Sequence, residues 1–266
     1  MTANRKRSLR RTAPRASARS PFTIALLSVL AVATSCATLG IGGVTLISVE
    51  EEWEMGRQLE AEIAEEMPIS DDQTLIRPVT QIGERIVAQS DKADLEWRFH
   101  VVEDESVNAF NVPGGLVYVH SGLIAEADDE DELAAVIAHE VGHGAARHGA
   151  ERLSQQYEMA LLAQVVLGED PGLVQQIAAE IAAAGTLARH SRSQEFEADE
   201  LGVEYLHAAG YDPEGMLRFF ERLLELQERE PGAVERFFAT HPDLEDRIEA
   251  IEEQIQELRA GVQAPR

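Results

Sequence analysis

The sequence is organised around one stretch, Glu132-Leu133-Ala134-Ala135-Val136-Ile137-Ala138-His139-Glu140-Val141-Gly142-His143-Gly144. It contains the pattern HExxH, with His139 and His143 four residues apart and Glu140 between them. Apolar residues recur in it at helical spacing, so we expect a helix. On a helix both imidazoles project from one face and can bind a single metal ion. Glu140 can then take a proton from a metal-bound water, which is the general-base role in zinc peptide hydrolysis.

A second carboxylate pair follows HExxH by about fifty residues, on a helix expected to run from Arg189 towards Ala209. Glu195 and Asp199 are four residues apart and share a face of that helix. If Glu195 reaches the metal, Asp199 can accept a hydrogen bond from the outer nitrogen of a ligand histidine and fix its tautomer. Taken alone the pair is ordinary for a solvated helix, but its place after HExxH makes it a candidate for the same site.

The acidic composition argues against binding to polyanions. The chain of 266 residues carries 23 basic and 48 acidic residues, a net charge of −25, with an ordinary 44% of hydrophobic residues. Seven of the basic residues and no acidic one fall within residues 1–36, so the remainder holds 16 basic and 48 acidic residues. A body this acidic should repel nucleic acid and anionic lipid surfaces. Its charge is otherwise explained by solubility or a salty habitat.

The N-terminus has the layout of an export signal. A basic stretch reaches Arg19, an apolar run follows from Phe22 to Ala33, and small residues precede Cys36, the single cysteine. The end of this segment resembles a bacterial lipobox, so residues 1–36 are expected to be a signal peptide whose removal leaves Cys36 lipidated. An uncleaved membrane anchor and plain secretion are the alternatives. Each places the body outside the cytoplasm, on the periplasmic side of a bacterial envelope.

The remaining patterns predict an α+β fold that is predominantly helical, with a small antiparallel sheet just before the HExxH helix. Period-two alternation and turn residues predict strands at Leu95–Val102, Ser106–Val112 and Gly115–His120. Amphipathic spacing predicts further helices at Glu50–Met67, Asp71–Ser90, Glu151–Leu167, Leu173–Ala188, Pro213–Arg229 and Leu244–Leu258. We expect a single domain over residues 49–260 and a disordered tail over residues 261–266. A sheet edge could bind an extended peptide as an added strand, or the strands could only cover the core.

Three motifs in order, HExxH, Glu195-x-x-Ala198-Asp199 and Thr240-His241-Pro242, resemble those of the gluzincin-type zinc metallopeptidases related to HtpX and the CAAX prenyl proteases. The runs Asn108-Ala109-Phe110 and Pro113-Gly114-Gly115-Leu116-Val117-Tyr118-Val119 also fit that family. The resemblance extends roughly from Val49 to Ile251. It is greatest to the soluble-bodied periplasmic members, the BepA-like and LoiP-like proteins, and implies a zincin-like metalloprotease domain.

The resemblance implies one Zn²⁺ per chain, held by His139, His143 and Glu195, with Glu140 as base and acid and Asp199 behind the ligands. It implies that the strand containing Asn108, Ala109, Phe110 and Asn111 docks the substrate. His241 and Arg247 are candidates to stabilise the oxyanion. His241 has a second implied role, as a fourth zinc ligand that keeps the enzyme latent.

The resemblance also has limits. Membrane members of the family embed several helices, whereas this chain has at most one candidate span, so prenyl processing is not expected. BepA-like members carry helical repeats after the protease domain, and none is visible before Arg266.

The leading hypothesis is therefore an envelope zinc endopeptidase that acts on misfolded or misassembled envelope proteins. A zinc-stabilised chaperone or assembly factor for outer-membrane proteins, with little proteolysis, is the main alternative. A zinc hydrolase acting on another substrate, such as a small peptide, is a third.

Overall fold

Three strands form the centre of the described part of the chain. The structure is a computed structural model and describes residues 45, 47–93, 95–156, 171–184 and 189–261. β1 (Arg98–Val102), β2 (Ala109–Val112) and β3 (Leu116–His120) lie in the order β1-β3-β2. β2 pairs with β3 in antiparallel orientation, whereas β1 pairs with β3 in parallel orientation. The expectation of an antiparallel sheet is thus wrong for β1, because the β2–β3 hairpin inserts its second strand, β3, beside β1.

Helices make up most of the rest, so the predicted α+β, predominantly helical class is confirmed. The described helices are α2 (Val49–Glu66), α3 (Gln73–Val87), α4 (Ser121–Glu126), α5 (Glu130–Ala145), α6 (His148–Gln156), α8 (Pro171–Ala184), α9 (Arg192–Ala209), α10 (Glu214–Arg229), α11 (Pro231–Thr240) and α12 (Leu244–Arg259). The sequence patterns missed α4, which is short, and α11, whose start is marked only by Pro231 in its first turn. Parts of the helices expected at 151–167 and 173–188 lie outside the described residues.

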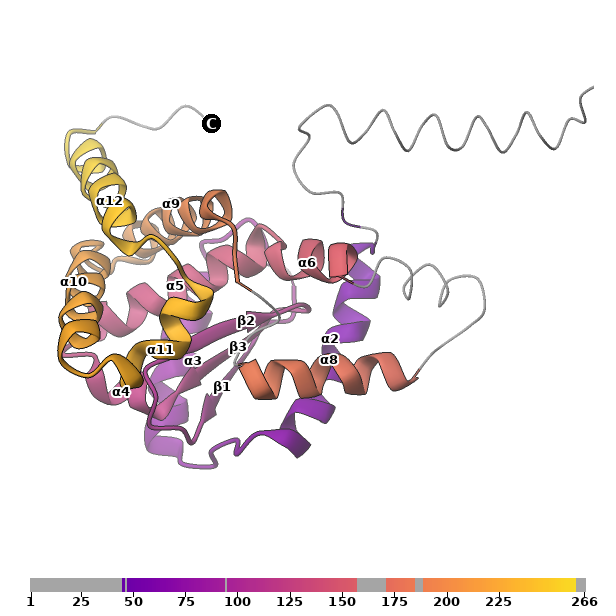
Figure 1. The fold of residues 1–266 in the computed structure, drawn as a ribbon. Helices are drawn as coiled ribbons and strands as arrows, with labels where there is room; N and C mark the ends of the chain where they lie inside the picture. Colours follow the sequence, from indigo (N-terminus) through magenta and orange to yellow (C-terminus); the bar gives the residue numbers. More distant parts are fainter. Residues whose placement is uncertain (1–44, 46, 94, 157–170, 185–188, 262–266) are drawn as a thin grey trace, which may run out of the picture. The chain divides into compact units, whose positions relative to one another are not determined.

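The two faces of the sheet pack against different helices, because successive side chains of a strand point to opposite faces. Val117 and Val119 of β3 join one core cluster with residues of α3 and α5, whereas Leu116 and Tyr118 join another with residues of α2 and α8. The sheet therefore lies between two layers of helices (Figure 1). As a result, β2 and β3 are buried at every residue.

Local sequence fixes where the two functional helices begin. Asp129 caps α5, since its side chain accepts a hydrogen bond of 2.8 Å from the backbone N–H of Glu132. Ser191 and Gln194 form a capping box at the start of α9, with each side chain accepting from the other's backbone N–H. α9 ends at Gly210, whose φ of 79° is the left-handed conformation that glycine favours. These caps place Glu195 in the first turn of α9.

α5 and α9 approach each other closely at a glycine inside the HExxH pattern. A Cβ atom on Gly142 would lie 2.6 Å from the backbone oxygen of Ala198. Such a separation is shorter than any normal van der Waals contact, and the oxygen of Ala198 belongs to the backbone, so it cannot rotate away as a side chain could. The absence of a side chain at Gly142 therefore lets α9 lie against α5 at the level of the two motif histidines.

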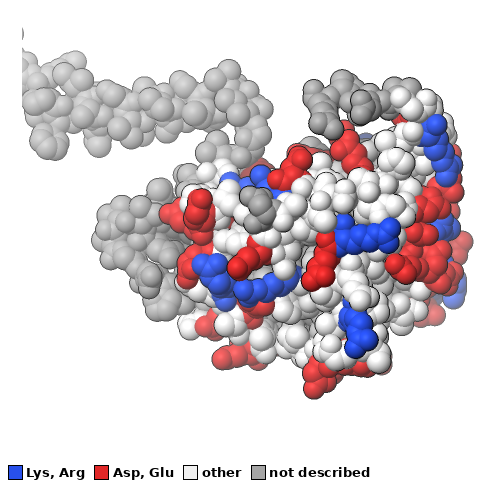
Figure 2. All heavy atoms as spheres, turned by 180° about the vertical axis from the view of Figure 1, so that it is seen from behind, with Lys and Arg blue, Asp and Glu red and all other residues white. Residues whose placement is uncertain are grey.

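Charged groups are mixed on the surface. Figure 2 shows acidic and basic side chains interspersed on one face, and some of them pair, such as Arg218 with Asp129 at 3.1 Å. None of the described helices is long and apolar enough to cross a membrane. The expected signal segment, including Cys36, lies outside the described residues, as does nearly all of the expected tail.

We expect Gly142→Ala to force α9 away from α5 and to destabilise the fold by roughly 1–3 kcal/mol, the usual cost of overpacking. It should also weaken metal binding, because the ligands on the two helices would separate. Urea unfolding and zinc affinity check both effects. Gly232→Ala is the matched control, since a Cβ there meets nothing within 4 Å. Equal stability of the two variants would contradict the close packing.

Candidate functional site

α5 and α9 bring three of the predicted metal ligands together. The Nε2 atoms of His139 and His143 are 3.0 Å apart. Glu195 faces them from α9, with Oε1 3.3 Å from Nε2 of His143 and Oε2 3.7 Å from Nε2 of His139. All three side chains are buried. The helical spacing and the order of the two motifs thus produce the cluster that the sequence predicted.

His241 joins this cluster from the residue that follows α11. Its Nδ1 lies 3.3 Å from Nε2 of His139 and 3.1 Å from Oε2 of Glu195. One ligand atom from each of His139, His143, Glu195 and His241 lies within 4.8 Å of the others. α11 ends at Thr240 and His241 is its C-cap, where the imidazole is buried within the cluster.

The cluster fits zinc. Imidazole nitrogen and carboxylate oxygen are ordinary zinc ligands, and ligands at about 2.0–2.1 Å from a tetrahedral ion lie roughly 3.3 Å from one another. The separations of 3.0–3.7 Å among the ligand atoms agree with that value. In addition, Nδ1 of His139 lies 2.9 Å from Oδ1 of Asp199, so the carboxylate can hold the proton there and leave Nε2 free to bind.

Arg247 of α12 lies behind the ligands and is fully buried. Its Nε and Nη2 donate to Asp199 at 2.6 and 2.7 Å, and its Nη1 donates to Glu195. All three guanidinium nitrogens therefore bind carboxylates of the site. This arrangement favours a positioning role for Arg247, while its predicted role towards the oxyanion stays a prediction.

Burial and charge together set the protonation of the site. Burial raises the pKa of Glu140 and lowers that of the His143 imidazole well below its usual value. Burial alone would raise the pKa of Glu195, but His241 and Arg247 lower it well below the usual range. For Asp199, Arg247 likewise outweighs burial and lowers the pKa. The ligand carboxylate is thus ionised, the ligand imidazole is neutral, and Glu140 has an increased affinity for a proton.

Glu140 lies beside the candidate metal ligands, and its carboxylate is the next feature of the site. Its side chain is completely buried, and its carboxylate oxygens form no short hydrogen bond within the described residues, although the backbone N–H of Asn111 is near enough to lower its pKa a little against the effect of burial. Oε1 lies 3.6 Å from Nε2 of His241. Burying a carboxylate with so few hydrogen bonds destabilises the folded state, so a functional reason for its position is expected. Its raised pKa suits a group that accepts a proton during a reaction.

The predicted substrate strand is the edge of the sheet nearest α5. Ala109, Phe110 and Asn111 belong to β2, which pairs only with β3 among the described strands, and β2 also contacts α5. Asn108 precedes β2 and is fully buried, and neither polar atom of its amide has a partner among the described residues. The strand therefore lies against the helix that carries His139 and His143, and its role in docking a substrate stays a prediction.

Sequence reasoning missed two buried histidines that contact His143. Nδ1 of His148 lies 2.8 Å from Nδ1 of His143, and the ring of His190 stacks on that of His143 with centroids 3.9 Å apart. Neither histidine has a partner at metal spacing in the sequence: His148 lies five residues after His143, off its helical face, and His190 lies 47 residues after it, from 190 − 143. The left-handed Arg147, with a φ of 61°, turns the chain between α5 and α6 and brings His148 back.

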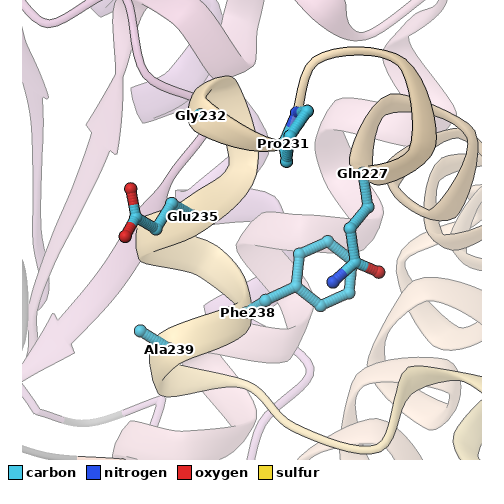
Figure 3. A pocket seen from close by; sticks show the side chains of 6 residues that line it. All are labelled: Gln227, Pro231, Gly232, Glu235, Phe238 and Ala239. Carbon is cyan, nitrogen blue, oxygen red and sulfur yellow. The ribbon is translucent and has the colours of Figure 1, made fainter.

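A surface pocket of about 540 Å³ lies beside α11. Figure 3 shows Gln227 of α10 and Glu235 and Phe238 of α11 around it. None of the metal-ligand candidates lines this pocket. It is therefore separate from the buried cluster, although His241 directly follows the same helix.

Comparison with known proteins gives consistent matches. Residues 76–255 match Peptidase family M48. The chain is 36% identical over 182 residues to the mitochondrial metalloendopeptidase OMA1 of Schizosaccharomyces pombe, covering 68% of this chain and 53% of that protein. It is 30% identical over 233 residues to the beta-barrel assembly-enhancing protease of Escherichia coli strain K12, covering 84% of this chain and 48% of that protein. The chain thus spans about half the length of these relatives.

We expect Arg247→Met to destabilise the metal-free protein by roughly 3–5 kcal/mol, because the buried carboxylates of Asp199 and Glu195 would lose their cation. Urea unfolding measures the loss. The control is Arg259→Met, which removes an exposed pair with Glu214 and should leave stability unchanged. A similarly small effect of both substitutions would mean that Arg247 does not hold the two carboxylates.

Proposed function

Because the chain belongs to peptidase family M48, we propose that it is a zinc-dependent endopeptidase that cleaves misfolded or misassembled proteins of the bacterial cell envelope. The family match confirms the resemblance to metallopeptidases that the sequence motifs indicated. The observation that carries the proposal is the buried cluster of His139, His143 and Glu195 with the unpaired carboxylate of Glu140 beside it.

The ligand set favours a catalytic zinc over a structural one. Structural zinc sites are closed by four protein ligands, whereas catalytic sites use three and leave one position for water or substrate. His139, His143 and Glu195 supply three ligands from two rigid helices. A structural site also needs no buried carboxylate such as Glu140 beside the ligands, with no short hydrogen bond within the described residues.

In the proposed mechanism, zinc bound here would polarise the scissile carbonyl and make the attacking water more acidic. Glu140 takes the water proton on a carboxylate oxygen and later delivers it to the leaving amide nitrogen. Asp199 holds the proton on Nδ1 of His139, and Arg247 holds the carboxylates of Asp199 and Glu195 in place. Burial keeps bulk water away from all these groups.

The substrate would lie along β2, on the side where no other described strand pairs with it. Backbone hydrogen bonds to an edge strand do not depend on side-chain identity, which suits a protease acting on many unfolded segments. The amide of Asn108, unpaired among the described residues, offers one further donor and acceptor to a peptide backbone. This proposal extends the sequence-based assignment of Asn108, Ala109, Phe110 and Asn111.

We place the protein in the envelope on two grounds, the export-type layout of residues 1–36 and the similarity to the beta-barrel assembly-enhancing protease of Escherichia coli. Its partners would be unfolded or misassembled envelope proteins, with attachment to a membrane through lipidated Cys36 or an N-terminal anchor. Residues 49–260 would form the single peptidase domain. The second candidate function is an assembly factor with little proteolysis; the words "assembly-enhancing" in the name of that relative favour its assembly part, whereas the word "protease" favours the first candidate.

His241 would act as a latch. With His241 in place the cluster offers four ligand groups, which is the closed set of a structural zinc site. α11 holds the latch from both ends: Ala233 O accepts a hydrogen bond of 2.9 Å from the backbone N–H of Val107, and Thr240 O accepts one of 3.1 Å from that of His190. Removing His241 would open the fourth position to water and substrate.

We expect Glu140→Gln to lower cleavage of unfolded casein by roughly 10²–10⁴-fold, the usual contribution of a general base. Zinc content should be retained, because Glu140 is not a ligand. Cleavage assays with metal analysis of both proteins test this. Equal cleavage by the variant and the wild type would sink the mechanism. No cleavage by either, with client aggregation still suppressed, would favour the assembly factor.

We expect His241→Ala to raise the basal rate of casein cleavage by roughly 5–150-fold, the range that a closing energy of 1–3 kcal/mol allows. Initial rates at equal zinc occupancy provide the measurement. His207→Ala, on the exposed face of α9, should leave the rate unchanged. An unchanged rate in His241→Ala would remove the latch, and a lower rate would instead assign His241 to the oxyanion.

A further inference from the structure

The two ligand histidines of α5 are supported in different ways. Nδ1 of His139 meets the carboxylate of Asp199 directly, at 2.9 Å. Nδ1 of His143 meets no carboxylate and instead lies 2.8 Å from Nδ1 of His148. Nε2 of His148 in turn lies 3.3 Å from Oε2 of Glu197. Each ligand histidine is therefore backed by a carboxylate: Asp199 contacts His139 directly, whereas Glu197 reaches His143 through the imidazole of His148.

One assignment of protons satisfies every atom of this chain of contacts. Nε2 of His143 faces Glu195 and His139, so it needs its lone pair to bind metal and the ring proton lies on Nδ1. That proton is donated to Nδ1 of His148, which must then carry its own proton on Nε2. Nε2–H of His148 donates to the carboxylate of Glu197. Both hydrogen bonds thus point outwards, from buried His143 to His148 and from His148 to exposed Glu197.

A second metal ion among His143, His148 and His190 is the competing explanation, because their ring nitrogens also lie within 4.8 Å of one another. The stacking of His190 on His143 argues against it. Their rings are nearly parallel, with an interplanar angle of 25° and centroids 3.9 Å apart. The lone pair of an imidazole nitrogen lies in the ring plane, so two stacked rings cannot both direct theirs at one ion.

We propose that His148 and Glu197 form a relay that fixes the tautomer and the orientation of His143 for zinc binding. The proposal rests on the proposed zinc site and adds two positioning residues to it. Both relay residues lie close in sequence to a proposed ligand: His148 is the first residue of α6, three residues after the end of α5, and Glu197 lies two residues after Glu195 on α9. Groups behind a metal ligand commonly contribute 10–100-fold to metal affinity, roughly the effect expected here.

Glu197 makes the relay testable without disturbing the core. Its side chain is 59% exposed, whereas that of His148 is 3% exposed. Glu197→Gln keeps the shape of the side chain and an acceptor oxygen but removes the negative charge, so it accepts the hydrogen bond from Nε2–H of His148 more weakly. Glu200→Gln, on the same helix and also exposed, is the matched control. His148→Phe removes the relay altogether, and His148→Gln retains an acceptor for Nδ1–H of His143.

The experiment measures zinc affinity by chelator competition, zinc per chain, thermal stability of the metal-free proteins, and the visible absorption of the Co²⁺-loaded proteins. We expect His148→Phe to weaken zinc binding by roughly 10–100-fold, with Glu197→Gln weakened less and His148→Gln partly restored. Glu197→Gln should also shift the Co²⁺ absorption bands while its metal-free stability matches that of Glu200→Gln. A merely structural role would not move these bands.

Wild-type zinc affinity and spectrum in Glu197→Gln and His148→Gln would overturn the relay while leaving the zinc site intact. Two zinc ions per wild-type chain, falling to one in His148→Phe, would overturn it in favour of the second metal ion. If the wild-type protein bound no zinc at all, both the relay and the proposed function would fail.

Discussion

Mutual compensation of buried charge is the constraint on which the site depends. Glu195, Asp199 and Arg247 are each at most 3% exposed, and a buried charge without a partner is too costly to keep. The guanidinium joins both carboxylates at once. Arg247 belongs to α12 and the two carboxylates belong to α9, so the site depends on the packing of the last described helix against α9.

The same charge compensation gives the two buried glutamates of the site, Glu195 and Glu140, opposite pKa shifts. Arg247 and His241 together keep Glu195 ionised in spite of its burial. Glu140 lies close by, but the largest effect on its own pKa comes from burial, which raises that pKa. Two glutamates in one buried cluster thus acquire opposite properties from their neighbours. The same fold can use one as a permanent anion and the other as a proton acceptor.

Sequence patterns predicted what local geometry determines. The i, i+4 spacing of His139 and His143, and of Glu195 and Asp199, was enough to place each pair on one helical face. The partners of Arg247 and the contact of His148 with His143 were not predictable in this way. The first depends on packing between α9 and α12. The second depends on the left-handed Arg147, a non-glycine residue whose conformation no pattern marks. The parallel pairing of β1 was missed because strand periodicity carries no information about order in a sheet.

The close contact of α5 with Ala198 changes what the HExxH pattern means in this fold. The pattern leaves two positions free, but the second of them, residue 142, faces the backbone oxygen of Ala198 at a distance that no side chain can occupy. In chains that pack these two helices in the same way, the informative signature is HExGH. A search with that stricter pattern, paired with a small residue at the position of Ala198, would select this architecture from the many chance occurrences of HExxH.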